Sequence, residues 1–178
     1  MRQAKQLGFE ILEGNNIKKF GGALLTSNPK EKRPLSLKKS SHLVMRSLHA
    51  RGPLSLLRHN EKIEKIINRQ AKKFGVKIYR YANGGNHLHM IILPMSRRAF
   101  NSFIRSITGL IARLVLKVER GDPKGIQFWE KRPFTRIVEW GSDYKRVCNY
   151  LLQNTLEALG FLEYQPRKTR YNPKTSTA

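Results

Sequence analysis

The chain has 178 residues, the length of one domain that can bury its own core. Its 35 Lys and Arg outnumber its 12 Asp and Glu, so the formal net charge is +23. A charge of this size excludes a near-neutral protein. Because so much charge of one sign repels itself in a compact fold and a polyanion would neutralise it, the charge favours a polyanionic partner such as nucleic acid. A surface charged for solubility and a ribosome-associated protein are the alternatives.

The single cysteine, Cys148, forms no internal disulfide and no Cys-x-x-Cys zinc pair, and we expect it to pack in the core. The first residues carry no apolar signal segment, and no apolar run approaches the ~20 residues of a membrane span. We therefore expect a reduced, cytoplasmic protein that has no membrane partner.

The two ends of the chain differ in composition from its centre. Residues 1–40 combine scattered lysines with glycines and prolines and show little periodicity, so they are predicted to be a loosely ordered basic leader. Residues 164–178 have a similar composition and are predicted to be a basic tail. The segment between them, residues 41–163, is predicted to be the functional domain.

Within this domain, residues 42–47 predict a strand and residues 55–74 predict a helix that Gly75 ends. Residues 76–82 predict a second strand. The run Asn83-Gly84-Gly85-Asn86 predicts a tight hairpin turn, because Asn and Gly accept positive φ. A third strand then begins at His87.

A long helix is predicted from its cap at Ser96 to Gly121, with an apolar stripe between Phe100 and Val118. Two short strands are predicted at 126–131 and 135–140, and a last helix at 143–159. This order predicts an α+β, ferredoxin-like sandwich with an antiparallel sheet. Two helices would cover the sheet face that carries Leu88, Met90 and Ile92, and the opposite face would carry His87, His89 and Ile91.

The motif His87-Leu88-His89 carries the strongest chemical signal. Alternate residues of a strand share a face, so the two imidazoles lie about 7 Å apart along one face and can converge on one metal ion. In a strongly basic chain, such a pair suggests chemistry on a phosphate. The alternative is a pair of partly exposed strand histidines without a ligand.

The last helix offers Tyr150 and Asn154, four residues apart and therefore on one helical face. They lie at the edge of the apolar stripe, where packing can hold a side chain that still reaches a substrate. Tyr144 is a competing nucleophile, but Cys148 stands four positions after it. Either Tyr150 or Asn154 alone would be read as an ordinary packing or surface residue.

These motifs resemble a known family. The run from Asn86 to Leu93 matches the His-hydrophobic-His signature of HUH nucleases. Tyr-Leu-Leu-Gln-Asn at 150–154, about 60 residues further on, resembles the tyrosine helix of single-tyrosine HUH transposases, the IS200-like family, and especially the REP-associated tyrosine transposase branch. The similarity covers roughly residues 42–161. It departs from the branch at Thr155, where a proline is common.

The resemblance implies that His87, His89 and Asn154 hold one Mg²⁺ or Mn²⁺ ion and that Tyr150 is the catalytic nucleophile. The implied reaction is metal-dependent cleavage and rejoining of single-stranded DNA through a 5′-phosphotyrosine. The expected partner is single-stranded DNA with a hairpin, bound by a monomer or a homodimer. His42, His49 and His59 are expected to have ordinary surface or packing roles.

Basic residues of the long helix and of the segment after it are predicted to touch the DNA backbone: Arg97, Arg98, Arg105, Arg113, Lys117, Arg132 and Arg136. Two other functions stay open at this point. One is a non-catalytic nucleic-acid-binding module on the same sheet, although no aromatic-rich RNA-recognition motif is present. The other is a nickase of the replication-initiator or relaxase type.

Overall fold

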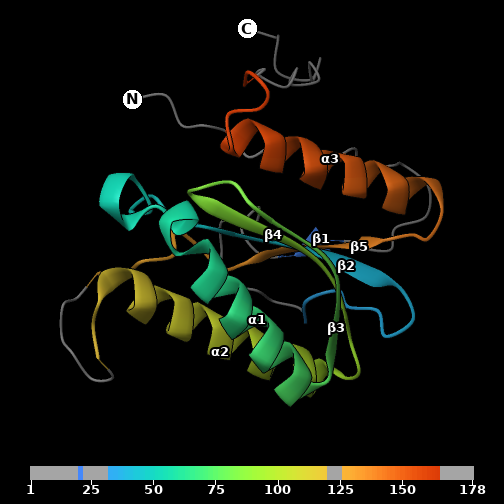
Figure 1. Cartoon of the computed structure of the whole chain (residues 1–178). Helices are drawn as coiled ribbons and strands as arrows, with labels where there is room; N and C mark the ends of the chain where they lie inside the picture. The colour runs from blue at the N-terminus through green and yellow to red at the C-terminus, as the bar shows by residue number, and fades with distance from the viewer. Residues whose placement is uncertain (1–19, 22–31, 120–125, 165–178) are drawn as a thin grey trace, which may run out of the picture.

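The computed structural model describes residues 20–21, 32–119 and 126–164. Its centre is an antiparallel sheet in the order β1-β5-β2-β4-β3, with helices on both faces (Figure 1). The strands are β1 Phe20–Gly21, β2 Ser40–Arg46, β3 Val76–Asn83, β4 His87–Pro94 and β5 Phe134–Val138. The helices are α1 Asn60–Phe74, α2 Arg97–Leu116 and α3 Ser142–Ala158, with short 3₁₀ turns at Gly52–Leu54 and Leu56–His59.

The four longer strands and the helices α1 and α2 form two interleaved β–α–β units. Each unit encloses one antiparallel strand of the other, which is the ferredoxin-like arrangement that the sequence predicts. α3 lies on the sheet face opposite to α1 and α2 (Figure 1). The predicted fold class is therefore confirmed, and the tyrosine-bearing helix forms a layer of its own.

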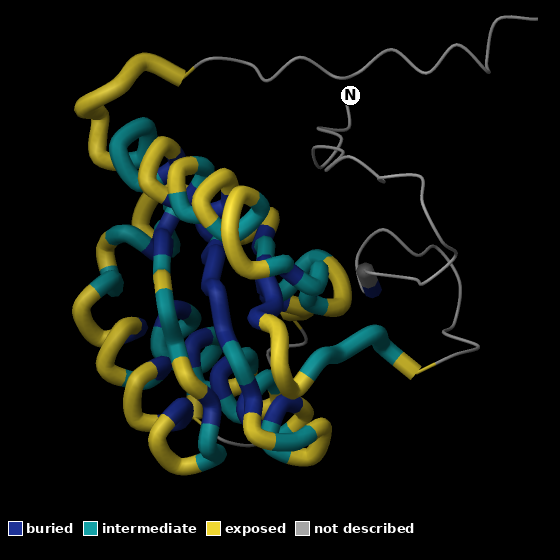
Figure 2. The backbone as a smooth tube through the Cα atoms, turned by 90° about the vertical axis from the view of Figure 1, so that its right-hand side faces the viewer, coloured by how far each residue is buried: buried dark blue, intermediate teal, exposed yellow. Residues whose placement is uncertain are grey.

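The two faces of the sheet have different interiors. α1 and α2 cover an apolar core that contains Leu43, Met45, Leu88, Met90 and Ile92, each at most 1 % exposed. A smaller cluster under α3 contains Ile91, Val138, Val147 and Leu151. Figure 2 shows the central strands β2 and β4 mostly buried, whereas the edge strand β3 and the outward sides of the helices are largely intermediate or exposed.

The hairpin between β3 and β4 positions the histidine motif as the sequence predicts. Gly85 has a φ of +83°, and Gly84 N donates to the His87 carbonyl oxygen at 2.9 Å. A Cβ atom at Gly84 would collide with the His87 ring, so glycine at this position gives the imidazole its space. The turn residues thus fix both the strand register and the place of the first histidine.

The predicted strand at 126–131 is wrong. This segment is irregular: Glu130 N donates to the Arg46 carbonyl oxygen, and the Ser47 hydroxyl donates to the Phe128 carbonyl oxygen. Phe128 is buried against the core, and the indole of Trp129 donates to the Thr108 carbonyl oxygen. The aromatic residues that read as strand formers therefore anchor a loop through their side chains.

Several boundaries also differ from the sequence expectation. α1 begins at Asn60, because two 3₁₀ turns, Gly52–Leu54 and Leu56–His59, occupy the segment before it. α2 ends at Leu116, where Lys117 adopts a φ of +52°; the predicted stop at Gly121 lies outside the described residues. The sequence did not predict β1, which pairs with β5. Most of the predicted leader and tail lies outside the described residues.

α2 is long and apolar enough, by length and composition, to cross a membrane. The apolar composition of α2 is explained by its packing inside the fold. Its stripe of Phe100, Phe103, Ile107, Ile111 and Val115 is buried, at most 2 % exposed, against the sheet and α1. α2 is therefore a core helix in this fold.

Candidate active site

β2, β4 and α3 bring five polar side chains of the predicted domain to one face of the sheet. The alternation of β4 puts His87 and His89 on the α3 side, while Leu88 between them is fully buried on the other. The two imidazole centroids are 4.6 Å apart with planes at 89°. The two imidazoles therefore lie side by side on the α3 face, and their convergence on a metal ion stays a prediction.

Tyr150 of α3 lies against one member of this pair, His89, and against His42 of β2. Its ring centroid is 5.4 Å from that of His89 and 6.1 Å from that of His42, edge-on in both cases. Its ring also packs beside the cluster formed by Ile91, Val147 and Leu151, and it stays partly exposed. The tyrosine is thus held by apolar contacts and keeps access to solvent, as its place at the edge of the helical stripe predicts.

Asn154 lies one helical turn beyond Tyr150 and is 6 % exposed. Its Nδ2 donates to the Tyr150 carbonyl oxygen at 2.6 Å. With the nitrogen engaged in that bond, Oδ1 is the amide atom that can bind a cation, and a carboxamide oxygen suits Mg²⁺ and Mn²⁺. Among the described residues, no three His, Cys, Asp or Glu side chains could hold an ion together. A site here therefore depends on a ligand of another type, such as this amide.

The Nδ1 contacts of the histidine pair fit a metal site. His87 Nδ1 lies 2.6 Å from Asn86 Oδ1, which can only accept, so the imidazole proton of His87 is on Nδ1. His89 Nδ1 lies 3.0 Å from His42 Nε2. Metal-binding histidines commonly use one ring nitrogen in this way and bind the ion through the other, which is Nε2 in both rings. The residues present thus fit one divalent cation.

His42 is the residue of this cluster that sequence reasoning missed. It is completely buried on β2, and burial together with the Arg136 charge lowers its pKa to about 3, with Asp143 opposing the shift. The imidazole is therefore neutral at neutral pH. A single histidine in the run His-Leu-Val-Met reads as a packing residue, and its partner lies 47 positions away. The signal available in the sequence was that side chains alternate between the two faces along each strand, so His42 and His89 can share a face if their strands are neighbours.

An ion pair ties the start of α3 to the sheet. Asp143 accepts from both Nη atoms of Arg136, at 2.9 and 3.1 Å, and from the Glu139 backbone N–H at 3.0 Å. Burial raises the pKa of Asp143, but these hydrogen bonds and the Arg136 charge outweigh it, so the net shift is downward. Arg136, a predicted DNA contact, is thus paired within the protein and helps to orient α3.

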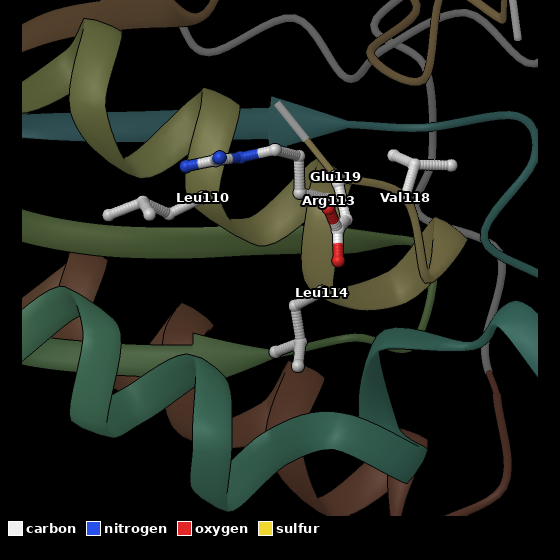
Figure 3. Close-up of a pocket in the computed structure, with 5 residues that line it drawn as sticks. All are labelled: Leu110, Arg113, Leu114, Val118 and Glu119. Atoms are coloured by element: carbon white, nitrogen blue, oxygen red, sulfur yellow. The ribbon is translucent and has the colours of Figure 1, made fainter. Parts of the chain in front are cut away.

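The other predicted DNA contacts lie apart from the histidines. Five of them are on α2 or at its end, and α2 covers the opposite face of the sheet: Arg97, Arg98, Arg105, Arg113 and Lys117. The sixth, Arg132, is exposed in the segment before β5. A cavity of about 470 Å³ at the end of α2 includes Arg113 and Glu119 among its lining residues (Figure 3). It contains no member of the histidine cluster.

Arg46 lies nearer to the histidines, and it was not predicted. It stands opposite His87 in the β2–β4 register, and alternation along β2 puts its side chain on the same face. Its Nε lies 3.3 Å from Glu130 Oε2, and both side chains are about a quarter exposed. A guanidinium beside the histidine pair is suited to a phosphate oxygen.

Comparison with known proteins agrees with this architecture. The family model described as "Transposase IS200 like" matches residues 37–154, which include all four predicted site residues. The chain therefore belongs to the IS200-like transposase family. A search of curated proteins gives no significant match.

Among solved structures, the chain is similar to a REP-associated tyrosine transposase determined bound to a REP hairpin. The TM-score is 0.59 at 17 % sequence identity, over 76 % of this chain and 77 % of that one. At this identity the likeness establishes a shared fold. The histidine strand and the tyrosine helix thus led from the sequence to the correct family and fold.

Proposed function

We propose that the protein cleaves and rejoins single-stranded DNA with Tyr150 as the nucleophile. The observation that carries this proposal is the edge-on packing of Tyr150 against His89, whose ring in turn lies beside that of His87. Membership of the IS200-like transposase family supports the reaction class. The net charge of +23 supports a nucleic-acid substrate.

His87 Nε2, His89 Nε2 and Asn154 Oδ1 would hold one Mg²⁺ or Mn²⁺ ion. When bound, the ion supplies Lewis-acid polarisation of the phosphate and lowers the cost of ionising a nearby phenol, whose ordinary pKa is about 10. Asn154 serves both parts of the site, because its Nδ2 bonds the carbonyl oxygen of the nucleophile's own residue. The helix therefore sets the tyrosine and the amide ligand as one unit.

The proposed step forms a bond between Tyr150 Oη and the phosphorus atom and breaks the bond from phosphorus to the 3′ oxygen. The phenol loses its proton, and the leaving 3′ oxygen takes up a proton to become a hydroxyl. The products are a 5′-phosphotyrosine and a free 3′-OH. Because the phosphodiester bond energy is kept in the new ester, another 3′-OH can reverse the step and join strands without ATP.

We propose that single-stranded DNA, carrying a hairpin, follows basic side chains on the surface. Contacts from α2 require DNA that also reaches the sheet face opposite to Tyr150. Contacts from Arg46, which stands opposite His87, need no such path. Affinity should fall with salt at a log–log slope of roughly −0.7 for each phosphate neutralised on a single strand.

The test is covalent capture of labelled single-stranded oligonucleotides, including hairpin-bearing ones, by the full chain with Mg²⁺ or Mn²⁺. The wild type should give a protein–DNA adduct that peptide mass spectrometry locates at Tyr150. Tyr150→Phe should lose at least about 10³-fold in adduct formation, or ~4 kcal/mol of barrier, because only the attacking oxygen is removed. Tyr144→Phe is the matched control and should retain the adduct.

Full adduct formation by Tyr150→Phe would refute the assignment. Metal-independent DNA binding with no strand scission would instead support the non-catalytic binding module. Transfer to a second strand should follow when an oligonucleotide with a free 3′-OH is added, and its absence together with efficient cutting would favour a nickase.

A further inference from the structure

His42 and His89 form a buried pair of imidazoles between adjacent strands. In the β2–β4 register His42 stands opposite Ile91 and His89 opposite Val44, so the two histidines are diagonal neighbours. Their rings are nearly parallel, with planes at 19° and centroids 5.2 Å apart. His42 Nε2 and His89 Nδ1 are 3.0 Å apart, so one ring donates a proton to the other.

The direction of this hydrogen bond decides which nitrogen of His89 can bind an ion. If His89 Nδ1 carries the proton and His42 Nε2 accepts it, His89 Nε2 keeps its lone pair. The neighbouring ligand already has this arrangement, because His87 Nδ1 faces the oxygen of Asn86. The two metal-facing imidazoles would then share one tautomer, each set by a different partner.

A histidine at position 42 is costly unless it has a role. Its neighbours on β2, Leu43, Val44 and Met45, are buried apolar residues, and an apolar side chain at 42 would avoid the desolvation of an imidazole. His42 is not placed as a third ligand, since its Nε2 faces His89 Nδ1 and no group of three His, Cys, Asp or Glu in the described chain could hold an ion. His42 also meets the Tyr150 ring edge-on, and its contact with His89 is the one that reaches a proposed metal ligand.

We propose that His42 is a positioning residue that fixes the ring orientation and the tautomer of His89, so that Nε2 of His89 is directed to the cation. This inference rests on the proposed metal-dependent function for the identity of the ligand. It adds a third histidine, from a different strand, that supports the ion without touching it. Outer partners of this kind typically contribute 10–100-fold to metal affinity, on the order of the effect expected here.

The test compares His42→Leu with His42→Gln in the full chain without DNA. Leucine fills the space but cannot accept a hydrogen bond, whereas the Gln Oε1 can occupy the place of the imidazole Nε2. Calorimetric titration with Mn²⁺ should show roughly 10–100-fold weaker binding by His42→Leu and near wild-type binding by His42→Gln. Thermal unfolding without metal controls for folding, and both variants should unfold in a single cooperative transition as the wild type does.

A second readout needs no metal. In ¹⁵N-histidine NMR spectra, His89 of the wild type and of His42→Gln should be the Nδ1-protonated tautomer, and His42→Leu should lose that preference. If the wild type and His42→Leu bind Mn²⁺ equally, or His89 keeps its tautomer in His42→Leu, the inference is wrong. If the wild type itself binds no Mn²⁺, the proposed metal site fails and the inference falls with it.

Discussion

The two faces of the central sheet use the same strands for different purposes. On the α1–α2 face, β2 and β4 present Leu43, Met45, Leu88 and Met90, an apolar interior with no titratable side chain among these four. On the α3 face, the alternate residues include His42, Arg46, His87 and His89. The α1–α2 face therefore stabilises the fold, while the α3 face has polar side chains where apolar contacts could have formed. One α-helix covers this second face.

Adjacent residues on β4 give the sharpest test of this division. Leu88→Ala should lower the free energy of unfolding by about 3 kcal/mol, because it leaves a cavity under α1 and α2. Adduct formation per folded molecule should stay close to that of the wild type. Urea unfolding and single-turnover capture measure the two quantities, with Leu88→Met as the volume-matched control. A large loss of chemistry in a folded Leu88→Ala protein would show that the faces are not separable.

A charged residue on the α3 face should show the reverse pattern. Arg46→Ala should lower adduct formation at saturating DNA by roughly 30-fold, about 2 kcal/mol, because a guanidinium beside His87 can stabilise charge on the phosphate. Stability should change little, since the pair with Glu130 is partly exposed. Arg105→Ala on α2 is the matched control. Equal losses of chemistry from the two variants would contradict a special role for the α3 face.

The Arg136–Asp143 pair should show how α3 is held to its face. Asp143→Asn should cost roughly 1–2 kcal/mol of unfolding free energy at pH 7, because a partly buried arginine loses its charged partner. The pKa of Asp143 is lowered by folding, so its contribution is present above the unfolded pKa of about 3.9 and is lost as pH falls through the folded value. The difference in unfolding free energy between the Asp143→Asn variant and the wild type, measured with urea, should therefore shrink at pH 3. A difference that stays constant from pH 7 to pH 3 would exclude the carboxylate as its source.

The sequence predicted the parts of this molecule that local chemistry decides. The Asn-Gly-Gly-Asn turn, the alternation of His87, Leu88 and His89, and the stripe of α2 each depend on nearby residues, and the structure shows all three. The role of Tyr150 was predicted from its spacing of four residues to Asn154 together with a family resemblance. The metal and its ligands stay predictions, while the fold and the family are confirmed.

What local chemistry could not reveal depends on register between distant segments. His42 meets His89 and Arg46 stands opposite His87 only because β2 pairs with β4 in one particular alignment. The strand prediction for residues 126–131 was wrong for a related reason. The aromatic residues of this segment contact α2 and the end of β2, and these contacts hold it as a loop in place of strand pairing. The motifs therefore indicated His87, His89, Tyr150 and Asn154, whereas His42 and Arg46 join the site only through the pairing of β2 with β4.

The most direct test of the proposed metal site is a diffraction experiment on crystals of the full chain soaked with Mn²⁺, using the anomalous signal of the metal. We predict one peak bound by His87 Nε2, His89 Nε2 and Asn154 Oδ1, with Tyr150 of the same chain beside it. A fully occupied ion elsewhere, or an empty histidine pair at a concentration that supports DNA cleavage, would contradict this prediction.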